Sequence, residues 1–117
     1  MGNGEYEYAS GEKYIGDWKE NLRHGEGKLI LSEKSYYEGE WKDGKREGFG
    51  IMIYDNGDKY EGLWVKDRKN GRGFYQWCNG TFYHGDWKED NMNGEGVYLD
   101  ESGLEISGIW NDNELCE

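Results

Sequence analysis

Proline is absent from the 117-residue sequence, and only 34% of its residues are hydrophobic. The lack of proline argues against proline-rich linkers. No apolar run approaches the ~20 residues that a membrane-spanning helix needs, and no apolar signal-peptide segment follows Met1. Basic residues are also few, since 14 Lys and Arg oppose 25 Asp and Glu for a net charge of −11. This charge opposes binding to nucleic acid and to anionic membranes, so we expect a soluble, single-domain, cytoplasmic protein.

Motifs of catalysis and metal binding are equally scarce. A disulfide between the two cysteines, Cys78 and Cys116, would be unusual in a cytosolic chain. The two histidines, His24 and His84, lie far apart, and no CxxC or HxxxH spacing is present. The Gly-x-Gly segments lack the third glycine of a dinucleotide-binding loop. We therefore predict no metal, no cofactor and no catalytic residues: the protein is expected not to be an enzyme.

Glycine and aromatic residues, by contrast, are abundant, with 20 Gly, 6 Trp, 10 Tyr and 3 Phe. They recur every 23 residues as Tyr-x-Gly-x-Trp followed by Gly-x-Gly, and no insertion or deletion breaks the register. The repeated aromatic positions are Tyr14, Tyr37, Tyr60 and Tyr83, with Ile106 at the fifth station, and Trp18, Trp41, Trp64, Trp87 and Trp110. An unbroken period of this length indicates a repeat architecture.

Each unit contains two segments with strand character, such as Tyr60–Trp64 and Gly48–Tyr54. Turn signals such as Asn56-Gly57 predict a hairpin with an odd-length turn, a type I turn plus a bulge. Lys34 replaces the turn glycine in one unit, which predicts a longer or more mobile turn there. The polar segment 42–47 is predicted to be a six-residue loop at the opposite hairpin end. The fold class is thus all-β: a single-layer antiparallel hairpin array of about ten strands, about 48 Å across at ~4.8 Å per strand.

Strand alternation assigns the repeated residues to one face of this sheet. Tyr60, Gly62 and Trp64 share a face, and Met52 and Tyr54 of the preceding segment join them. Glycine at position 62 leaves room for the large rings to lie across the sheet. The opposite face is mostly polar.

This unit closely resembles the MORN (membrane occupation and recognition nexus) repeat. The resemblance covers a half-unit 2–13, four units 14–36, 37–59, 60–82 and 83–105, and a terminal half-unit 106–117. It departs from the pattern at Ile106, Lys34 and Glu117. The sequence is compatible both with an excerpt of a longer array and with a complete small protein.

The resemblance implies a curved β solenoid, built from hairpins, whose aromatic groove holds segments of partner proteins. Similar proteins include junctophilins, ciliary radial-spoke components and myosin-tail binders. We therefore expect an adaptor or scaffold for a cytoskeletal or motor-associated partner, at the cytoskeleton or cell cortex.

The regular Tyr and Trp residues have two interpretations: they form the core of a thin solenoid, or they contact a partner. A single layer without covering helices leaves part of this face open, which favours an interaction site there. The expected ligand is a helical or extended peptide segment rich in Lys and Arg. The predicted groove residues are Tyr6, Tyr8, Leu29, Leu31, Met52, Tyr54, Tyr60, Trp64, Tyr75, Trp77, Tyr83, Trp87 and Tyr98. Glu38, Glu40, Glu61 and Asp86 are either acidic contacts or a solvated face.

Three other surfaces are candidates for assembly. An apolar patch on the opposite face is predicted to meet a second chain or another part of the partner; it contains Phe49, Ile51, Ile53, Leu63 and Phe74. The edge strands, near Gly4–Tyr8 and Ile106–Trp110, could pair in an edge-to-edge homodimer. The alternative function is a peripheral membrane or phosphoinositide-binding module that uses basic loop residues, namely Lys42, Lys45, Arg46, Lys66, Arg68 and Lys69.

Overall fold

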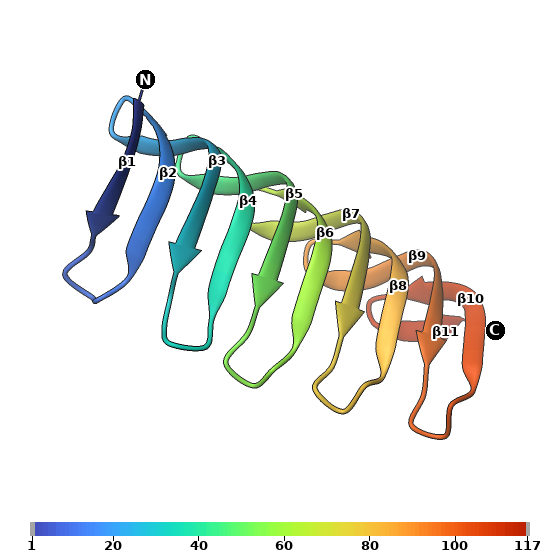
Figure 1. Ribbon diagram of the computed structural model, residues 1–117. Coiled ribbons are helices and arrows are strands. Elements are labelled where there is room, and N and C mark those ends of the chain that lie inside the picture. Colours follow the sequence, from blue (N-terminus) through green and yellow to red (C-terminus); the bar gives the residue numbers. More distant parts are fainter. Residues whose placement is uncertain (1, 117) are drawn as a thin grey trace.

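The computed structural model describes residues 2–116, which form one open antiparallel sheet (Figure 1). Neighbours in the sheet are neighbours in sequence, so every connection is a hairpin. The predicted all-β single layer is confirmed, with eleven strands in place of about ten. The strands are β1 (Gly2–Glu7), β2 (Lys13–Lys19), β3 (Leu22–Ile30), β4 (Tyr36–Lys42), β5 (Lys45–Ile53), β6 (Lys59–Val65), β7 (Arg68–Gln76), β8 (Phe82–Lys88), β9 (Asn91–Leu99), β10 (Glu105–Asn111) and β11 (Glu114–Cys116).

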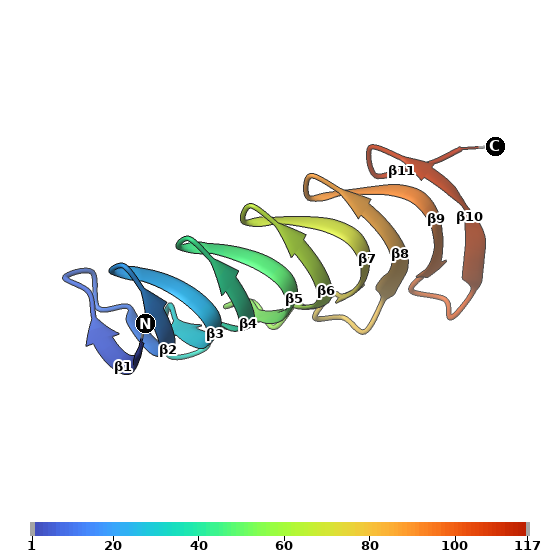
Figure 2. The same ribbon diagram turned by 90° about the horizontal axis from the view of Figure 1, so that it is seen from above.

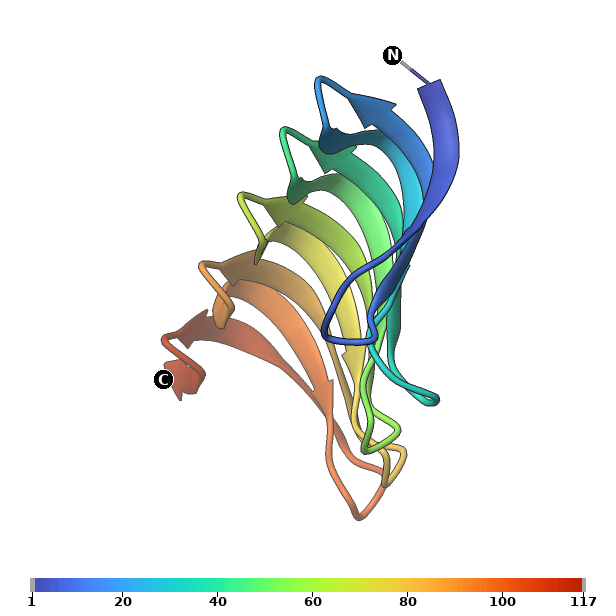
Figure 3. The same ribbon diagram turned by 90° about the vertical axis from the view of Figure 1, so that its left-hand side faces the viewer.

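The sheet is a long, bent trough. Its principal extents are 48 × 25 × 17 Å, and the longest agrees with the predicted width. Figure 2 shows the strands following one another along the trough, and Figure 3 shows that every strand curves in the same sense. The sheet therefore has one concave and one convex face.

The longer hairpin turns have the predicted form. In the turn after β5, Gly57 N donates to Tyr54 O (3.0 Å) and Tyr54 N donates to Asp58 O (2.9 Å). Gly57 has a φ of 95°, as the bulge after a type I turn requires. The resulting register pairs Met52 with Tyr60 and places them on one face, as predicted.

The turn after β3 is not longer than the others, so the expectation of a longer turn is wrong. Ile30 pairs with Tyr36 just as the equivalent residues pair in the next hairpin. The Ser32 hydroxyl accepts hydrogen bonds from the backbone N–H groups of Lys34 (3.3 Å) and Ser35 (3.1 Å). These bonds close the turn without the left-handed glycine.

The predicted six-residue loop over 42–47 is also wrong. Lys42 pairs directly with Lys45, which leaves a two-residue turn at Asp43-Gly44. Both turn residues have positive φ, 50° and 85°, as a type I′ turn requires. The Gly44 N–H also donates to Arg23 O of the preceding unit (2.8 Å), so each such turn is attached to its neighbour along the array.

The aromatic rings form the core on the concave face. Tyr14, Tyr37, Tyr60 and Tyr83 have no exposed surface, and Trp64 is 2% exposed. Tyr60 shows the arrangement: its hydroxyl donates to Leu63 O (2.9 Å), and its ring meets Trp64 at 5.1 Å and Trp87 of the next unit at 5.6 Å, both nearly perpendicular. The ring lies across Gly73, where an added Cβ would come within 2.5 Å of Tyr60 Cζ. A Cβ added at Gly62, the position predicted from the sequence, would come within 2.7 Å of the Tyr60 hydroxyl oxygen, so the predicted role of Gly62 is confirmed.

Candidate functional site on the concave face

Six of the thirteen predicted groove residues are core residues. Tyr60, Trp64, Tyr83 and Trp87 are at most 6% exposed, so they support the concave face and have no surface to offer a partner in this structure. Leu29 and Met52 are buried in the same way. The remaining predicted residues keep open surface; we call them the open aromatic row, and they are Tyr6, Tyr8, Leu31, Tyr54, Tyr75, Trp77 and Tyr98.

The rings of this row touch one another along the trough. Tyr54 and Tyr75 have centroids 5.7 Å apart, Tyr75 and Trp77 are 4.9 Å apart, and Trp77 and Tyr98 are 5.7 Å apart. The contacts join β7 to the segments that follow β5 and β7 and to β9. They create a continuous half-buried aromatic surface over the middle and C-terminal units.

A buried carboxylate fixes the centre of the row. Asp58, 5% exposed, accepts hydrogen bonds from the Tyr75 hydroxyl (2.7 Å) and from Cys78 N (2.9 Å). Burial, followed by the hydrogen bond to Asp58, raises the pKa of Tyr75 well above its ordinary value. Burial likewise raises the pKa of Tyr54 to about 12. Both hydroxyls therefore stay neutral hydrogen-bonding groups at physiological pH.

Three basic side chains lie on the concave face, where the sequence reasoning placed none: it missed Arg23 and assigned Arg46 and Lys69 to loops. Arg23 Cζ lies 4.5 Å from the ring centroid of Trp41, and Arg46 Cζ lies 4.4 Å from that of Trp64. Lys69 Nζ lies 5.0 Å from the ring centroid of Trp87. These cations are themselves 23 residues apart, a signal that the sequence contained. Arg46 and Lys69 belong to β5 and β7, so their assignment to basic loops was wrong.

Each cation lies over aromatic rings, and the two arginines also donate to the next two-residue turn. Arg46 Nε donates to Asp67 Oδ1 (3.1 Å), and its Nη2 donates to Asp67 O (2.9 Å). Lys69 Nζ is 4.9 Å from the Tyr75 centroid, and the rings of Tyr60 and Tyr54 are at 5.7 and 6.0 Å. Burial lowers the pKa of Lys69, and the negative charge of Asp90 opposes that shift. The three cations make cation–π contacts with the rings of the trough.

Arg46 and Lys69 therefore do not belong to the set of basic loop residues that the sequence predicted as a membrane-binding site. The other members, Lys42, Lys45, Lys66 and Arg68, lie at the ends of strands or in the two-residue turns, next to Asp43 and Asp67. Interspersed acids reduce the attraction of such turns for an anionic headgroup.

The four predicted acidic contacts do not lie beside the open aromatic row. They are on the convex face, where three of them have partners within the chain. Glu40 accepts from Phe49 N (2.8 Å), Asp86 accepts from Arg72 (3.0 Å), and Glu61 pairs with Lys59 (2.5 Å). Glu38 is exposed on the same face, opposite Ile51.

The predicted apolar patch occupies the middle of the convex face. Phe49 and Leu63 are 47% and 42% exposed and lie opposite each other on β5 and β6. Ile51, Ile53 and Phe74 are half-buried. The ring of Phe74 also contacts Phe82 at 5.2 Å, so the patch continues onto β8.

The two ends of the sheet differ from the prediction in one respect. β1 is an edge strand, but the other edge is β11 and not the segment Ile106–Trp110. β11 pairs with Ile109–Asn111 only, which leaves the outer edge of the first part of β10 open in the described chain. Cys78 and Cys116 are free and exposed.

The structure and the sequence pattern agree with a comparison against known families. The profile of the MORN repeat matches residues 1–13, 14–35, 37–59, 60–82 and 83–105. The chain belongs to the MORN-repeat family. MORN repeats occur in proteins that interact with other proteins or with membranes, and they are in general non-catalytic modules.

Residues 2–116 contain neither a membrane-spanning helix nor a cluster of metal ligands. No helix in this part of the chain has the length and hydrophobicity needed to cross a membrane. No group of three or more His, Cys, Asp or Glu side chains among these residues is arranged to hold a metal ion.

Proposed function

We propose that the protein is a non-enzymatic adaptor or scaffold that binds a segment of another protein along its concave face. The observation that supports this most strongly is the open aromatic row. Its rings are held rigidly from beneath by the buried core and by Asp58, yet nothing in the described chain covers them. A preorganised aromatic surface of this kind supplies desolvation energy with little loss of side-chain entropy.

The shape of the trough favours a linear segment as the ligand. The row runs across successive strands, along the 48 Å axis of the molecule. A helix of about 30 residues at ~1.5 Å per residue would span this length, and a shorter extended segment would do the same. The partner binds lengthwise, with apolar side chains on the rings.

The charge of the protein favours a basic segment. The net charge of −11 accelerates encounter with a cationic partner. Two of the three concave cations are offset by nearby acids, because Arg46 is paired with Asp67 and the negative charge of Asp90 acts on Lys69. A concave cleft of about 280 Å³ includes Glu12 beside Leu31, and this half-buried carboxylate is available to a Lys or Arg next to an apolar anchor.

The cellular role that fits this activity is in the cytoplasm, at the cytoskeleton or cell cortex. This assignment rests on the resemblance to cytoskeletal and motor-associated relatives and belongs to the proposal.

Selection from a random peptide display library tests the proposed function. The wild type is compared with a concave variant, Tyr54→Ser/Trp77→Ser, and a convex control, Phe49→Ser/Leu63→Ser. Circular dichroism establishes that both variants fold. Peptides enriched on the wild type should carry an excess of Lys and Arg, should lose at least tenfold in affinity for the concave variant and should keep their affinity for the control.

The opposite sensitivity, with binding lost only in the convex variant, would contradict the proposal. Flotation of the protein with phosphoinositide-containing vesicles, together with no enriched peptide, would favour the membrane function instead.

A further inference from the structure

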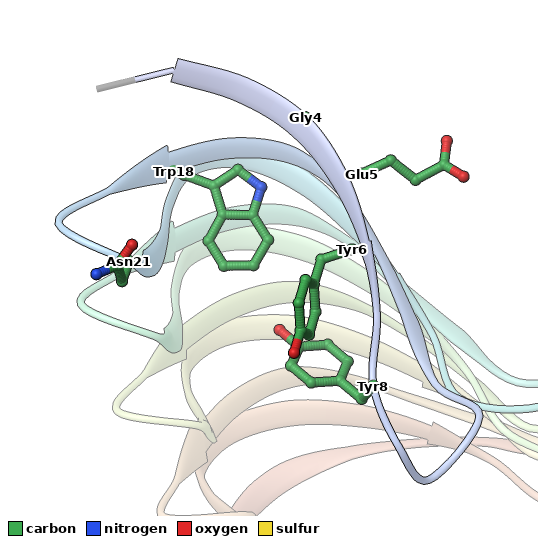
Figure 4. Close-up of a pocket in the computed structure, with 6 residues that line it drawn as sticks. All are labelled: Gly4, Glu5, Tyr6, Tyr8, Trp18 and Asn21. Atoms are coloured by element: carbon green, nitrogen blue, oxygen red, sulfur yellow. The ribbon is translucent and has the colours of Figure 1, made fainter.

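The N-terminal end of the trough contains a cleft of about 480 Å³ (Figure 4). Its lining includes Tyr6, Tyr8, Trp18 and Asn21. The Tyr6 ring is 53% exposed, and its centroid lies 6.0 Å from Trp18 and 4.8 Å from Tyr8. Figure 4 shows these rings on the inner side of the bent sheet, while Glu5 extends from the outer side.

The same pair of rings encloses a cation farther along the array. The two rings nearest to Lys69 Nζ are Tyr75 (4.9 Å) and Trp87 (5.0 Å). Their counterparts three repeats earlier are Tyr6 and Trp18, which face the cleft. In the intervening units, Arg23 and Arg46 lie over the equivalent tryptophans. Within residues 2–116, no Lys or Arg side chain lies over Trp18.

In the two units where the cation is an arginine, a hydrogen-bond acceptor completes the arrangement. It comes from the residue 21 positions after the cation: Asp67 accepts from Arg46, and Gly44 O accepts from Arg23 (2.9 Å). Asp90 stands at this position for Lys69. The counterpart at the cleft is Asn21, whose amide and backbone oxygens are acceptors.

We propose that this cleft binds an arginine side chain of a protein partner, with the guanidinium stacked on Trp18 beside Tyr6 and donating to Asn21. The planar guanidinium suits a site that combines a ring face with a neutral carbonyl acceptor. The net charge of −11 further favours a cationic occupant. The identity of the occupant as part of a protein rests on the proposed function, but the site itself can be tested with a small probe.

The probe is the peptide acetyl-Gly-Arg-Gly-amide, and the readout is the NMR signal of each tryptophan indole N–H. The matched control peptide contains citrulline, which has nearly the same shape as arginine but no charge. The arginine peptide should shift the Trp18 signal saturably and leave the signals of Trp41, Trp64 and Trp87 in place, since those rings already carry the chain's own cations. The citrulline peptide should bind at least about fivefold more weakly.

Two variants examine the wall and the acceptor of the cleft. Tyr6→Ala removes an exposed ring and should weaken binding about fivefold. Asn21→Asp installs the carboxylate that Asp67 and Asp90 supply in two later units, and it should tighten binding about threefold at low salt. Aspartate is compatible with this turn, because Asp67 and Asp90 hold the same position with φ of 70° and 73°, against 67° for Asn21.

The proposal is overturned if the arginine peptide shifts no indole signal up to tens of millimolar, if citrulline binds equally well, or if all tryptophans shift together. Equal affinity of the wild type, Tyr6→Ala and Asn21→Asp would also overturn it. These outcomes are distinct from a failure of the proposed function, which is measured on the Tyr54→Ser/Trp77→Ser variant with longer peptides.

Discussion

Substitution of Gly73 by alanine should disrupt the packing of one repeat from within. The backbone at this glycine is the surface on which the Tyr60 ring lies. An alanine Cβ there would come within 2.5 Å of Tyr60 Cζ and 2.6 Å of Cε1, far inside van der Waals contact. The ring is completely buried between two strands and two tryptophans, so it must leave its site or the strands must separate.

The expected cost follows from the contacts that Tyr60 would lose. Its two perpendicular ring pairs, with Trp64 and Trp87, contribute about 0.5–1.5 kcal/mol each beyond burial. The hydrogen bond from its hydroxyl to Leu63 O (2.9 Å) contributes about 0.5–1.5 kcal/mol. We expect Gly73→Ala to lower the free energy of unfolding by about 2–4 kcal/mol.

Gly4→Ala is the matched control, because Gly4 holds the same position of the repeat. Its nearest neighbour is Trp18 Nε1, at an ordinary 3.8 Å from the added Cβ. Urea unfolding followed by tryptophan fluorescence should show a change within about 0.5 kcal/mol for this variant. If Gly73→Ala costs no more than Gly4→Ala, the conclusion that glycine is required to accommodate the ring is wrong.

Three further predictions concern pH and single side chains. Burial raises the pKa of six tyrosines, to about 12 for Tyr14, Tyr54 and Tyr83. The stability that these neutral tyrosines contribute is therefore fully present below the tyrosine pKa of the unfolded chain, about 10, and is lost as the pH rises above that value. Phenolate absorbance should therefore show these tyrosines ionising together with unfolding, and ionisation near pH 10 in a folded protein would refute this. Lys69→Met copies Met92, which holds the equivalent position of the next unit. It should raise the free energy of unfolding by about 0.5–1 kcal/mol in thermal or urea unfolding, because burial already disfavours the ammonium. A decrease of more than 1 kcal/mol in that free energy would show that the cation–π contacts dominate. Asp58→Ala should lower the free energy of unfolding by about 2–3 kcal/mol, since the Tyr75 hydroxyl and Cys78 N would lose their common acceptor. An unchanged urea midpoint would argue against a stabilising role of Asp58.

The aromatic and glycine pattern was sufficient to predict the sheet, its faces and half of its turns. Alternation along the strands placed Met52, Tyr60 and Trp64 together, and the odd-length turn at Asn56-Gly57 fixed the register. These features follow from strong local preferences, in which a glycine permits either a left-handed turn or a ring lying against the backbone.

Four of the five two-residue turns lack the usual Asn-Gly or Asp-Gly signal. The fifth, Asp43-Gly44, carries that signal, and the sequence reasoning failed to use it. In the turn Lys66-Asp67 both residues adopt left-handed conformations with φ of 47° and 70°. Tertiary contacts offset this cost: Asp67 N donates to Arg46 O (3.1 Å), and Arg46 donates to Asp67 in return. Such bonds connect residues 21 positions apart, beyond the reach of local sequence rules.

The misplaced turns also explain the errors at the candidate site. With strands ended too early, Arg46 and Lys69 fell into supposed loops, and their period of 23 residues was not connected with that of the tryptophans. The burial of Tyr60 and Trp64 beneath the open aromatic row depends on contacts between successive units, which a single repeat does not contain.

The central claim is that partners bind the concave face, and paramagnetic broadening in solution tests it most directly. A basic peptide selected on the wild type is labelled with a nitroxide and added to the isotope-labelled protein. The account predicts broadening of the side-chain signals of Tyr54, Tyr75 and Trp77, with those of Phe49 and Leu63 unaffected. Broadening of Phe49 and Leu63 alone would contradict it.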